Sequence, residues 1–317
     1  MSQQQRTLRI ATRTSPLALW QANYMAEQLR SLPTGHSVEI VHIITTGDTN
    51  QTDALRQFGG TGVFTREVQK AVLDDRADLA VHSLKDLPTV SAEGLVLGCV
   101  PPRAPRCDAL LVGSGSSAPS GLHDLPHNAR IGTGSPRRQA QLLHYRPDLK
   151  LEEIRGNVDT RIRKLDEGQF DAIILAEAGL TRLGLADRIS LHLHPPLFYP
   201  AVGQGALGIE CRSDDEELLK LLAQITCPQT LAEVTAERAL LRELRAGCHA
   251  PLAAWTSIIG DQLQLNSILL TSDGRLRLSH VEVGSKADAE FIGISAAQQL
   301  IAIGGDHLLN EPAPQDA

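Results

Sequence analysis

Residues 8–32 read LRIATRTSPLALWQANYMAEQLRSL, and this stretch displays the plan on which most of the chain is built. The short apolar and β-branched run Leu8–Thr12 predicts a strand. The amphipathic segment Pro16–Leu32 follows it and predicts a helix. Ser15 stands where its side chain can cap the first turn, and Pro16 occupies a position where no amide donor is missed. The stretch therefore predicts a strand, a tight loop and a helix in direct succession.

The same plan returns at residues 130–145, RIGTGSPRRQAQLLHY, where Ser135 lies 120 positions after Ser15. Again a strand pattern leads through a loop into Ser-Pro and a helical pattern. Ser135 is expected to cap this second helix, with Pro136 in its first turn. Two related α/β domains would explain the repeat, and a chance match of so short a motif is the alternative.

Strand and helix patterns alternate along most of the chain and change in character near the C-terminus. The alternation is typical of α/β layers with largely parallel sheets. After about residue 212, two helical patterns precede three consecutive strand patterns and a last helical one, which indicates a separate α+β region. The predicted strands are Leu8–Thr12, Val38–Thr45, Leu79–His82, Leu95–Val100, Ala109–Val112, Arg130–Thr133, Ala172–Ala176, Ala206–Cys211, Ala253–Ile259, Gln262–Leu270 and Arg275–Val283.

The composition is that of an ordinary globular protein, with 42% hydrophobic and 21% charged residues in a chain of 317. That length predicts two or three compact domains. The net charge of −7 argues against a general nucleic-acid binder, because phosphate neutralisation needs a basic surface. We find no apolar run of signal-peptide or membrane-span length. The five cysteines are scattered and form no CxxC pair, so we expect a cytoplasmic protein without a disulfide framework.

Arginines recur at the predicted strand-to-helix junctions. Arg137 and Arg138 fall in the first turn of the second Ser-Pro helix, where they oppose the helix dipole and repel each other. An anion between them would offset that cost, although a solvated basic helix end is an alternative. Arg155 and Arg161 surround another junction, and Arg182 follows the next strand. Because the planar guanidinium donates two parallel hydrogen bonds to a carboxylate, the set favours a pocket for a ligand with several carboxylates.

The stretch His82–Pro88 directly follows a predicted strand, and ligands of α/β sheets gather at the carboxyl ends of strands. Asp86 is therefore a candidate acid, base or cation-stabilising group, with Lys85 beside it to tune its charge. An aspartate that caps a helix before a turn is the structural alternative.

Cys248 lies in a predicted loop between a long helix and a strand, where a thiol can be reactive. By contrast, Cys99 and Cys211 fall in apolar strand patterns and are expected to be inert core residues. A cysteine in a loop is also often without any function.

Other familiar site patterns are incomplete. His192 and His194 have a strand-like spacing for two metal ligands, but no third ligand is evident, so we interpret them as structural and expect no metal. The Gly203–Gly205 turn is no dinucleotide fingerprint, and no nucleophile elbow of a serine hydrolase is present.

Seven motifs, taken in order, closely resemble the hydroxymethylbilane synthase (porphobilinogen deaminase) family. They cover roughly Leu8 to Pro251, and the remainder fits by length and pattern. The motifs are Arg9–Trp20, His82–Pro88, Gly132–Arg138, Arg155–Arg161, Ala178–Gly184, Tyr199–Arg212 and Gly247–Pro251.

The resemblance implies a fold of two periplasmic-binding-protein-like α/β domains and a smaller α+β C-terminal domain. With a crossover near residue 200, the implied domains are 1–104 with 200–222, then 105–199, then 223–317. The first carries the catalytic aspartate, the second the anion-binding arginines and the third a cysteine that holds the cofactor.

The resemblance also implies the reaction and its residues. Four molecules of porphobilinogen are condensed onto a dipyrromethane primer, which is attached by a thioether to Cys248, and linear hydroxymethylbilane is released for tetrapyrrole synthesis. Asp86 is the implied catalytic carboxylate. The only implied partner is the small-molecule substrate, with no nucleic acid and no membrane. The implied oligomeric state is a monomer. The positions implied to bind acetate and propionate groups, or to make lesser polar contacts, are Arg13, Ser15, Ser83, Lys85, Thr133, Ser135, Arg137, Arg138, Arg155, Arg161, Arg182 and Gln204.

This chemistry gives the residues a common purpose. Loss of ammonia from porphobilinogen leaves an electron-poor azafulvenium, whose positive charge an ionised Asp86 can stabilise. A proton must later leave the attacking pyrrole carbon, and Asp86 is the candidate that assists. A non-catalytic binding module that closes on an anion is the competing hypothesis, but such a module has no use for Cys248.

Two positions and one short run depart from the family pattern. Gln57 and Thr61 stand in a glycine-rich loop where lysine is common, which predicts a less cationic loop. The usual Asp-Pro-Arg-Asp-Ala run appears as Ala104-Pro-Arg-Cys107-Asp108-Ala109, so we expect that boundary to be built differently.

Overall fold

The computed structural model describes residues 6–33, 35–45, 65–246 and 250–310, and the chain divides into two compact units. The first unit comprises Met1–Ala104 and Ala206–Leu231, and the second comprises Pro105–Gly205 and Ala232–Ala317. None of the described helices is long and apolar enough to cross a membrane.

The first unit is built on a five-stranded mixed sheet in the order β2-β1-β3-β10-β4. β1 runs parallel to β2 and β3, whereas β10 runs antiparallel to both β3 and β4. The strands are β1 (Leu8–Arg13), β2 (Val38–Ile43), β3 (Leu79–Ser83), β4 (Leu95–Cys99) and β10 (Leu207–Arg212). The helices are α1 (Pro16–Ser31), α3 (Arg66–Leu73), the short η2 (Leu84–Asp86) and α7 (Glu216–Ala223).

Helices cover both faces of this sheet. On one face α1 contributes Met25 and Leu29, and α7 contributes Leu222, to a core in which all three are fully buried. On the other face α3 packs Val68 and Val72 against the strands. Each such buried aliphatic side chain stabilises the fold by about 1.5–3 kcal/mol relative to exposure.

The second unit contains a sheet with the same plan, in the order β7-β6-β8-β5-β9. Here β6 runs parallel to β7 and β8, and β5 runs antiparallel to β8 and β9. The strands are β5 (Asp108–Val112), β6 (Arg130–Gly132), β7 (Lys150–Glu152), β8 (Ala172–Ala176) and β9 (Leu191–Leu193). Around them lie η3 (Leu122–Asp124), α4 (Pro136–Tyr145), α5 (Val158–Asp166), α6 (Glu177–Arg182) and η4 (Ala186–Arg188).

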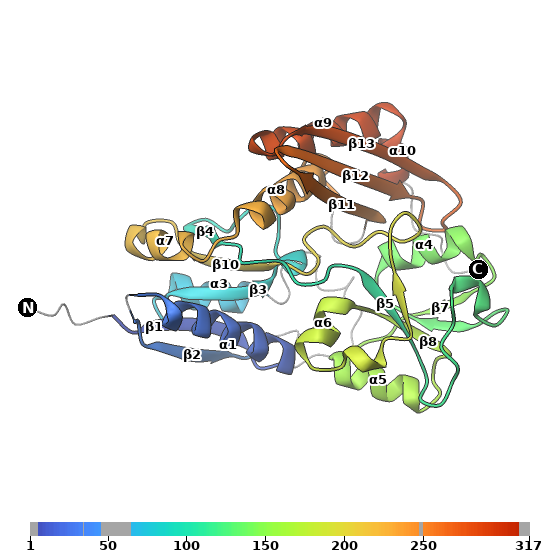
Figure 1. Ribbon diagram of the computed structural model, residues 1–317, viewed down its shortest axis with the longest axis horizontal. Coiled ribbons are helices and arrows are strands. Elements are labelled where there is room, and N and C mark those ends of the chain that lie inside the picture. The colour runs from blue at the N-terminus through green and yellow to red at the C-terminus, as the bar shows by residue number, and fades with distance from the viewer. Residues whose placement is uncertain (1–5, 34, 46–64, 247–249, 311–317) are drawn as a thin grey trace, which may run out of the picture. The chain divides into compact units, whose positions relative to one another are not determined.

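The shared strand order explains the repeat in the sequence. β1 and β6 occupy equivalent places in their sheets. Each is followed by a helix that begins at the proline of a Ser-Pro pair, and these helices are α1 and α4 (Figure 1). The crossing strands β10 and β5 are equivalent too, since each lies antiparallel between its neighbours.

A smaller antiparallel sheet, β11-β12-β13, completes the second unit. Helices α8 and α9 pack on one of its faces through Leu240, Ile292 and Leu300. The elements are α8 (Pro228–Glu243), β11 (Leu252–Ile259), β12 (Gln262–Leu270), β13 (Arg277–Ser285), η5 (Lys286–Asp288), α9 (Ala289–Ala302) and α10 (Gly305–Asn310).

The predicted fold class, two α/β sheets followed by a smaller α+β region, is confirmed. The expectation of largely parallel sheets is wrong, because two of the four pairings in each large sheet are antiparallel. Hydrophobic periodicity reports which face of a strand is buried and carries no sign of its direction. The three-domain boundaries implied by the family resemblance stay a prediction.

Candidate active site

The first group of predicted site residues lies at one edge of the first sheet. Arg13 ends β1 and Ser83 ends β3, and these strands are parallel neighbours, so their carboxyl ends share that edge. Ser15 caps α1 as predicted, because its Oγ accepts a hydrogen bond from the Ala18 amide at 3.4 Å. Ser83 Oγ accepts one from Gln21 Nε2 at 2.8 Å, which ties α1 to β3.

Asp86 stands on the turn that leaves this edge. It is the last residue of η2, whose N-cap position is Ser83, so it does not serve as the helix cap considered from the sequence. The buried Leu84 anchors the turn, and its amide donates to the Ala206 carbonyl at 3.0 Å. Lys85 is half-buried, whereas Asp86 is exposed. A carboxylate presented to solvent from an anchored turn is suited to acid–base work on a ligand.

A buried polar cluster that the sequence did not reveal lies behind this turn. The fully buried Glu210 on β10 accepts a hydrogen bond from Gln69 Nε2 at 2.9 Å, and its Oε2 lies 3.2 Å from His82 Nε2. The sequence did contain one signal for this cluster, which is the glutamate inside an apolar strand pattern. A charged residue is rarely fully buried unless it is paired, so such a glutamate predicts a buried partner.

The second group of site residues belongs to the second unit. The fully buried Thr133 follows β6 directly, and Ser135 occupies the N-cap position of α4. The expectation that Ser135 caps the helix with its side chain is wrong: the structure gives it no capping hydrogen bond. Its amide instead donates to Thr133 Oγ1 at 3.3 Å, which keeps the loop closed on itself.

Arg137 and Arg138 are buried at the start of α4 and share one carboxylate, that of Asp108 on β5. Arg137 Nη1 donates to Asp108 Oδ2 at 2.7 Å. Arg138 donates to Asp108 Oδ1 through Nε at 3.0 Å and Nη2 at 2.7 Å. The anion that the sequence predicted between the two arginines is thus supplied, at least in part, by the chain itself.

The charges of this cluster shift the pKa values of Asp108 and Arg137. Burial by itself raises the pKa of Asp108, but attraction to Arg137 and Arg138 and their hydrogen bonds outweigh burial and hold that pKa well below the usual value for an aspartate. Burial lowers the pKa of Arg137, with Asp108 opposing it and Arg138 adding to it. Asp108 is therefore ionised at neutral pH and binds both cations as a carboxylate.

Gln204 joins this network, and Arg182 contacts the residue that follows Gln204. Gln204 is buried, and its Nε2 donates to Asp108 Oδ1 at 3.0 Å and to the Arg106 carbonyl at 2.8 Å. Arg182, the last residue of α6, donates from Nη2 to the Gly205 carbonyl at 2.7 Å. These contacts tie the turn before β10 to the arginine-bearing end of the second sheet.

Arg155 and Arg161 lie at the next junction, between β7 and α5. Both are half-buried; Arg161 Nε donates to the Gly156 carbonyl at 2.8 Å, and Arg155 pairs with Glu153. Gly156 has φ +107, and a Cβ there would lie 2.6 Å from Thr160 Cγ2, so this junction requires glycine.

The two histidines contact neighbouring side chains, and their structural interpretation stays a prediction. His192 Nδ1 lies 3.3 Å from Glu177 Oε1, and His194 Nδ1 lies 3.1 Å from Cys107 Sγ. Among the described residues, no three His, Cys, Asp or Glu side chains are grouped to hold a metal ion.

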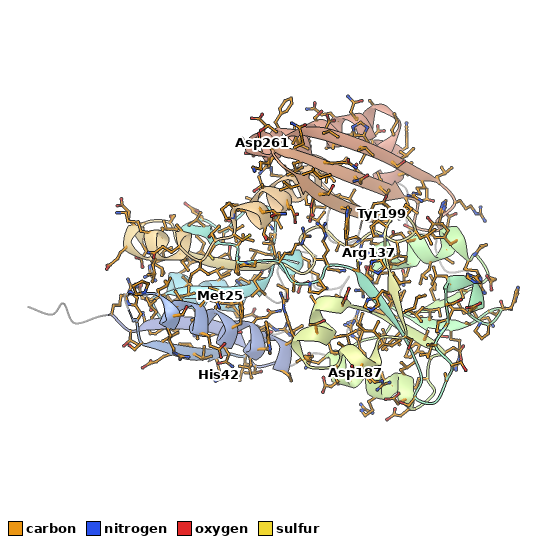
Figure 2. The ribbon with its side chains drawn as sticks, viewed as in Figure 1. Met25, His42, Arg137, Asp187, Tyr199 and Asp261 are labelled. Atoms are coloured by element: carbon orange, nitrogen blue, oxygen red, sulfur yellow. The ribbon has the colours of Figure 1, made fainter. Side chains whose placement is uncertain are left out.

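Cys248, Gln57 and Thr61 lie outside the described residues, so their predicted roles stay predictions. The elements on either side of Cys248 are α8, which ends at Glu243, and β11, which starts at Leu252. On β11 the Ala254 amide donates to the Pro200 carbonyl at 3.2 Å. The preceding carbonyl, that of Tyr199, accepts from Arg137 Nη1 at 2.6 Å, so β11 and the arginine cluster share one segment (Figure 2).

Two family models together match most of the chain. The model described as "Porphobilinogen deaminase, dipyromethane cofactor binding domain" matches residues 8–220, and "Porphobilinogen deaminase, C-terminal domain" matches residues 231–302. The chain belongs to the porphobilinogen deaminase family.

Curated relatives match the chain over nearly its full length, and solved structures superpose on about 70% of it. The porphobilinogen deaminase of Syntrophotalea carbinolica is 46% identical over 95% of each chain, and that of Maridesulfovibrio salexigens is 45% identical over 96% of this chain and 98% of its own. A domain of Bordetella pertussis BvgS superposes on 72% of this chain and 92% of its own with a TM-score of 0.42 at 16% identity. An ancestral arginine-binding protein superposes on 69% of this chain and 90% of its own with a TM-score of 0.38 at 14% identity.

The described residues fit the dipyrromethane cofactor of the family. Such a group carries carboxylates, and the second unit offers buried guanidinium groups at strand-to-helix junctions. Arg137 Nε is buried and has no hydrogen-bond partner among the described residues, which leaves one donor for a carboxylate.

Burial makes three of the described cysteines, Cys99, Cys107 and Cys211, poor nucleophiles and gives a direct test. It raises the pKa of Cys99 and of Cys107 to about 11 and that of Cys211 to about 12. We expect iodoacetamide at neutral pH to leave these three unmodified in the folded protein and to modify all of them in urea, because the thiolate is the nucleophile. Peptide mapping by mass spectrometry checks this, and fast labelling of any of the three in the folded protein would contradict it.

Proposed function

We propose that this chain is a transferase that condenses four molecules of porphobilinogen on a dipyrromethane primer held by Cys248, and then releases hydroxymethylbilane by hydrolysis. It acts in the cytoplasm as a monomer. The observation that supports this most is the buried arginine cluster of Arg137, Arg138 and Asp108 in a chain matched by both family models. Arginines buried at strand-to-helix junctions suit a ligand that carries several carboxylates.

The proposed binding groups divide between the two units. In the first unit they are Arg13, Ser15, Ser83 and Lys85, near the carboxyl ends of β1 and β3. In the second unit they are Thr133, Ser135, Arg137, Arg138, Arg155, Arg161, Arg182 and Gln204. Bidentate guanidinium contacts fix both the place and the orientation of a carboxylate, so the acetate and propionate groups of substrate and primer align the reacting carbons.

Asp86 is the proposed catalytic residue. When bound, the dipyrromethane supplies the nucleophilic pyrrole carbon. As ammonia leaves porphobilinogen, positive charge develops on the substrate, and the ionised Asp86 carboxylate stabilises it. The same carboxylate then accepts the proton released from the pyrrole carbon. The anchoring of Leu84 to the Ala206 carbonyl holds the turn that carries Asp86 in one place during both steps.

The proposed division of labour follows three domains, 1–104 with 200–222, 105–199 and 223–317. The first presents Asp86, the second the arginine cluster and the third Cys248. Gln204 in the segment that starts at residue 200 donates a hydrogen bond to Asp108 of the second part, and Pro200 accepts one from Ala254 of the third part, so this segment contacts both of them.

The intact mass of the purified chain under denaturing conditions tests this function. We expect an excess equal to two linked pyrrole units, located on the peptide that contains Cys248. An unmodified chain is next incubated with porphobilinogen; acquisition of that mass and turnover support the synthase. A chain that acquires no mass and consumes no porphobilinogen would instead favour the binding module that closes on an anion.

A further inference from the structure

Asp108 accepts hydrogen bonds from three side chains of the second unit at one buried carboxylate. Its side chain is fully buried, and Arg137 and Arg138 are only 4% and 6% exposed. Arg137 Nη1 reaches Oδ2, whereas Arg138 Nε, Arg138 Nη2 and Gln204 Nε2 reach Oδ1. Because Asp108 opens β5 and both arginines open α4, this carboxylate fixes the start of the helix against the sheet.

The charges of this cluster do not balance. Two guanidinium groups face one carboxylate, and, within the described part of the chain, the charged groups that shift the pKa of Arg137 are Asp108 and Arg138. The neighbouring Cys107 adds no negative charge at neutral pH, because burial raises its pKa to about 11. The N-terminal end of α4 adds further positive potential. A buried excess charge is costly unless an anion neutralises it, so the cluster favours a second anion.

One N–H donor of the cluster has no hydrogen-bond acceptor among the described residues. Arg137 Nη1 is bonded to Asp108 and to the Tyr199 carbonyl, but the buried Nε finds no acceptor within the described part of the chain. Buried donors in folded proteins are almost always paired. A buried, unpaired N–H next to an excess positive charge is suited to a ligand carboxylate.

We propose that Asp108 is the positioning residue of the primer and substrate pocket: it aligns Arg137 and Arg138 and leaves one buried positive charge for a ligand carboxylate to neutralise. The proposal deepens the proposed function and rests on it. Asp108 touches no reacting atom and acts through the two arginines. The Asp108 carboxylate sets the spacing of the two guanidinium groups and offsets the repulsion between them.

Asp108→Asn tests this role, because asparagine keeps the shape and removes the charge. Asp171→Asn is the matched control, since Asp171 pairs with Arg130 in the same unit but is exposed. We expect Asp108→Asn to carry less primer and to raise KM for porphobilinogen about 10- to 100-fold, because misplaced binding groups cost affinity for the reacting geometry. Asp171→Asn should keep the primer content and KM of the unaltered chain.

Stability is measured alongside, so that a structural role is distinguished from a positioning role. A lower melting temperature with unchanged primer content and KM in Asp108→Asn would overturn the proposal. If the unaltered chain itself carries no primer and consumes no porphobilinogen, the proposed function fails before Asp108 is tested.

A second measurement applies if Asp108→Asn does not fold. The full chain with Cys248→Ser is melted in sodium acetate and in sodium chloride of equal ionic strength. We expect acetate to raise the melting temperature above that in chloride. The difference should vanish when Arg138→Gln is added, since one cation then faces one carboxylate. An equal acetate effect with and without Arg138→Gln, or no effect in either, would overturn the proposal.

Discussion

Cys248→Ser is expected to give a folded protein that carries no primer and performs no turnover. A thioether requires a thiol, and the serine hydroxyl is a far weaker nucleophile at neutral pH. Intact mass spectrometry should show the bare chain before and after incubation with porphobilinogen, and consumption of porphobilinogen should stay at the background rate. Near-ultraviolet circular dichroism checks that the fold is kept.

Cys227→Ser is the matched control for this variant. Cys227 is half-buried, follows α7 and contributes nothing to the proposed site. We expect it to retain the primer mass and the turnover of the unaltered chain. Primer mass on the Cys248→Ser chain, or its loss in Cys227→Ser, would remove Cys248 from the proposal.

Asp86→Ala is expected to lower kcat by about 10²- to 10⁴-fold, because it removes both the stabilising charge and the proton acceptor. The side chain is exposed at the end of η2, so its truncation should leave the melting temperature almost unchanged. KM should change little, since the proposed carboxylate-binding groups remain in place. Steady-state rates of porphobilinogen consumption check this.

Two further variants separate the contributions of Asp86. Asp86→Asn keeps the shape and lacks the charge, so we expect it to resemble Asp86→Ala rather than the unaltered chain. Glu93→Ala removes another exposed carboxylate from the same unit and should be fully active. Turnover near that of the unaltered chain in Asp86→Ala would show that the reaction uses another group.

The sequence predicted elements well where local chemistry determines them. The pattern from Pro136 to Tyr145 gave α4 with its observed bounds, because proline starts the helix and the apolar spacing continues to its end. The three-residue strands β7 and β9 are too short to establish an apolar period, lack a neighbouring motif such as the Ser-Pro plan that follows β6, and depend on pairing with their neighbours. The directions of β5 and β10 depend on where the chain enters each sheet, which no local pattern contains.

For the candidate site too, the sequence predicted the residues that local patterns determine and missed those that depend on long-range contacts. Residues at the ends of strands, such as Ser15 and Asp86, could be proposed from their place after an apolar run. Asp108 was not recognised as a site residue, because its partners lie 29 and 30 positions away and become visible only when β5 and α4 come together. The sequence indicated that Arg137 and Arg138 need an anion, but it could not say that the chain supplies one.

The position of β10 between β3 and β4 has a consequence for the order in which the chain folds during synthesis. Although four strands of the first sheet are complete by residue 99, β4 has no partner in that sheet until residues 207–212 arrive. The sheet of β5 to β9 needs nothing beyond residue 193. A growing chain can therefore close the second sheet before the first, and the N-terminal strands await their last neighbour while it is still being translated.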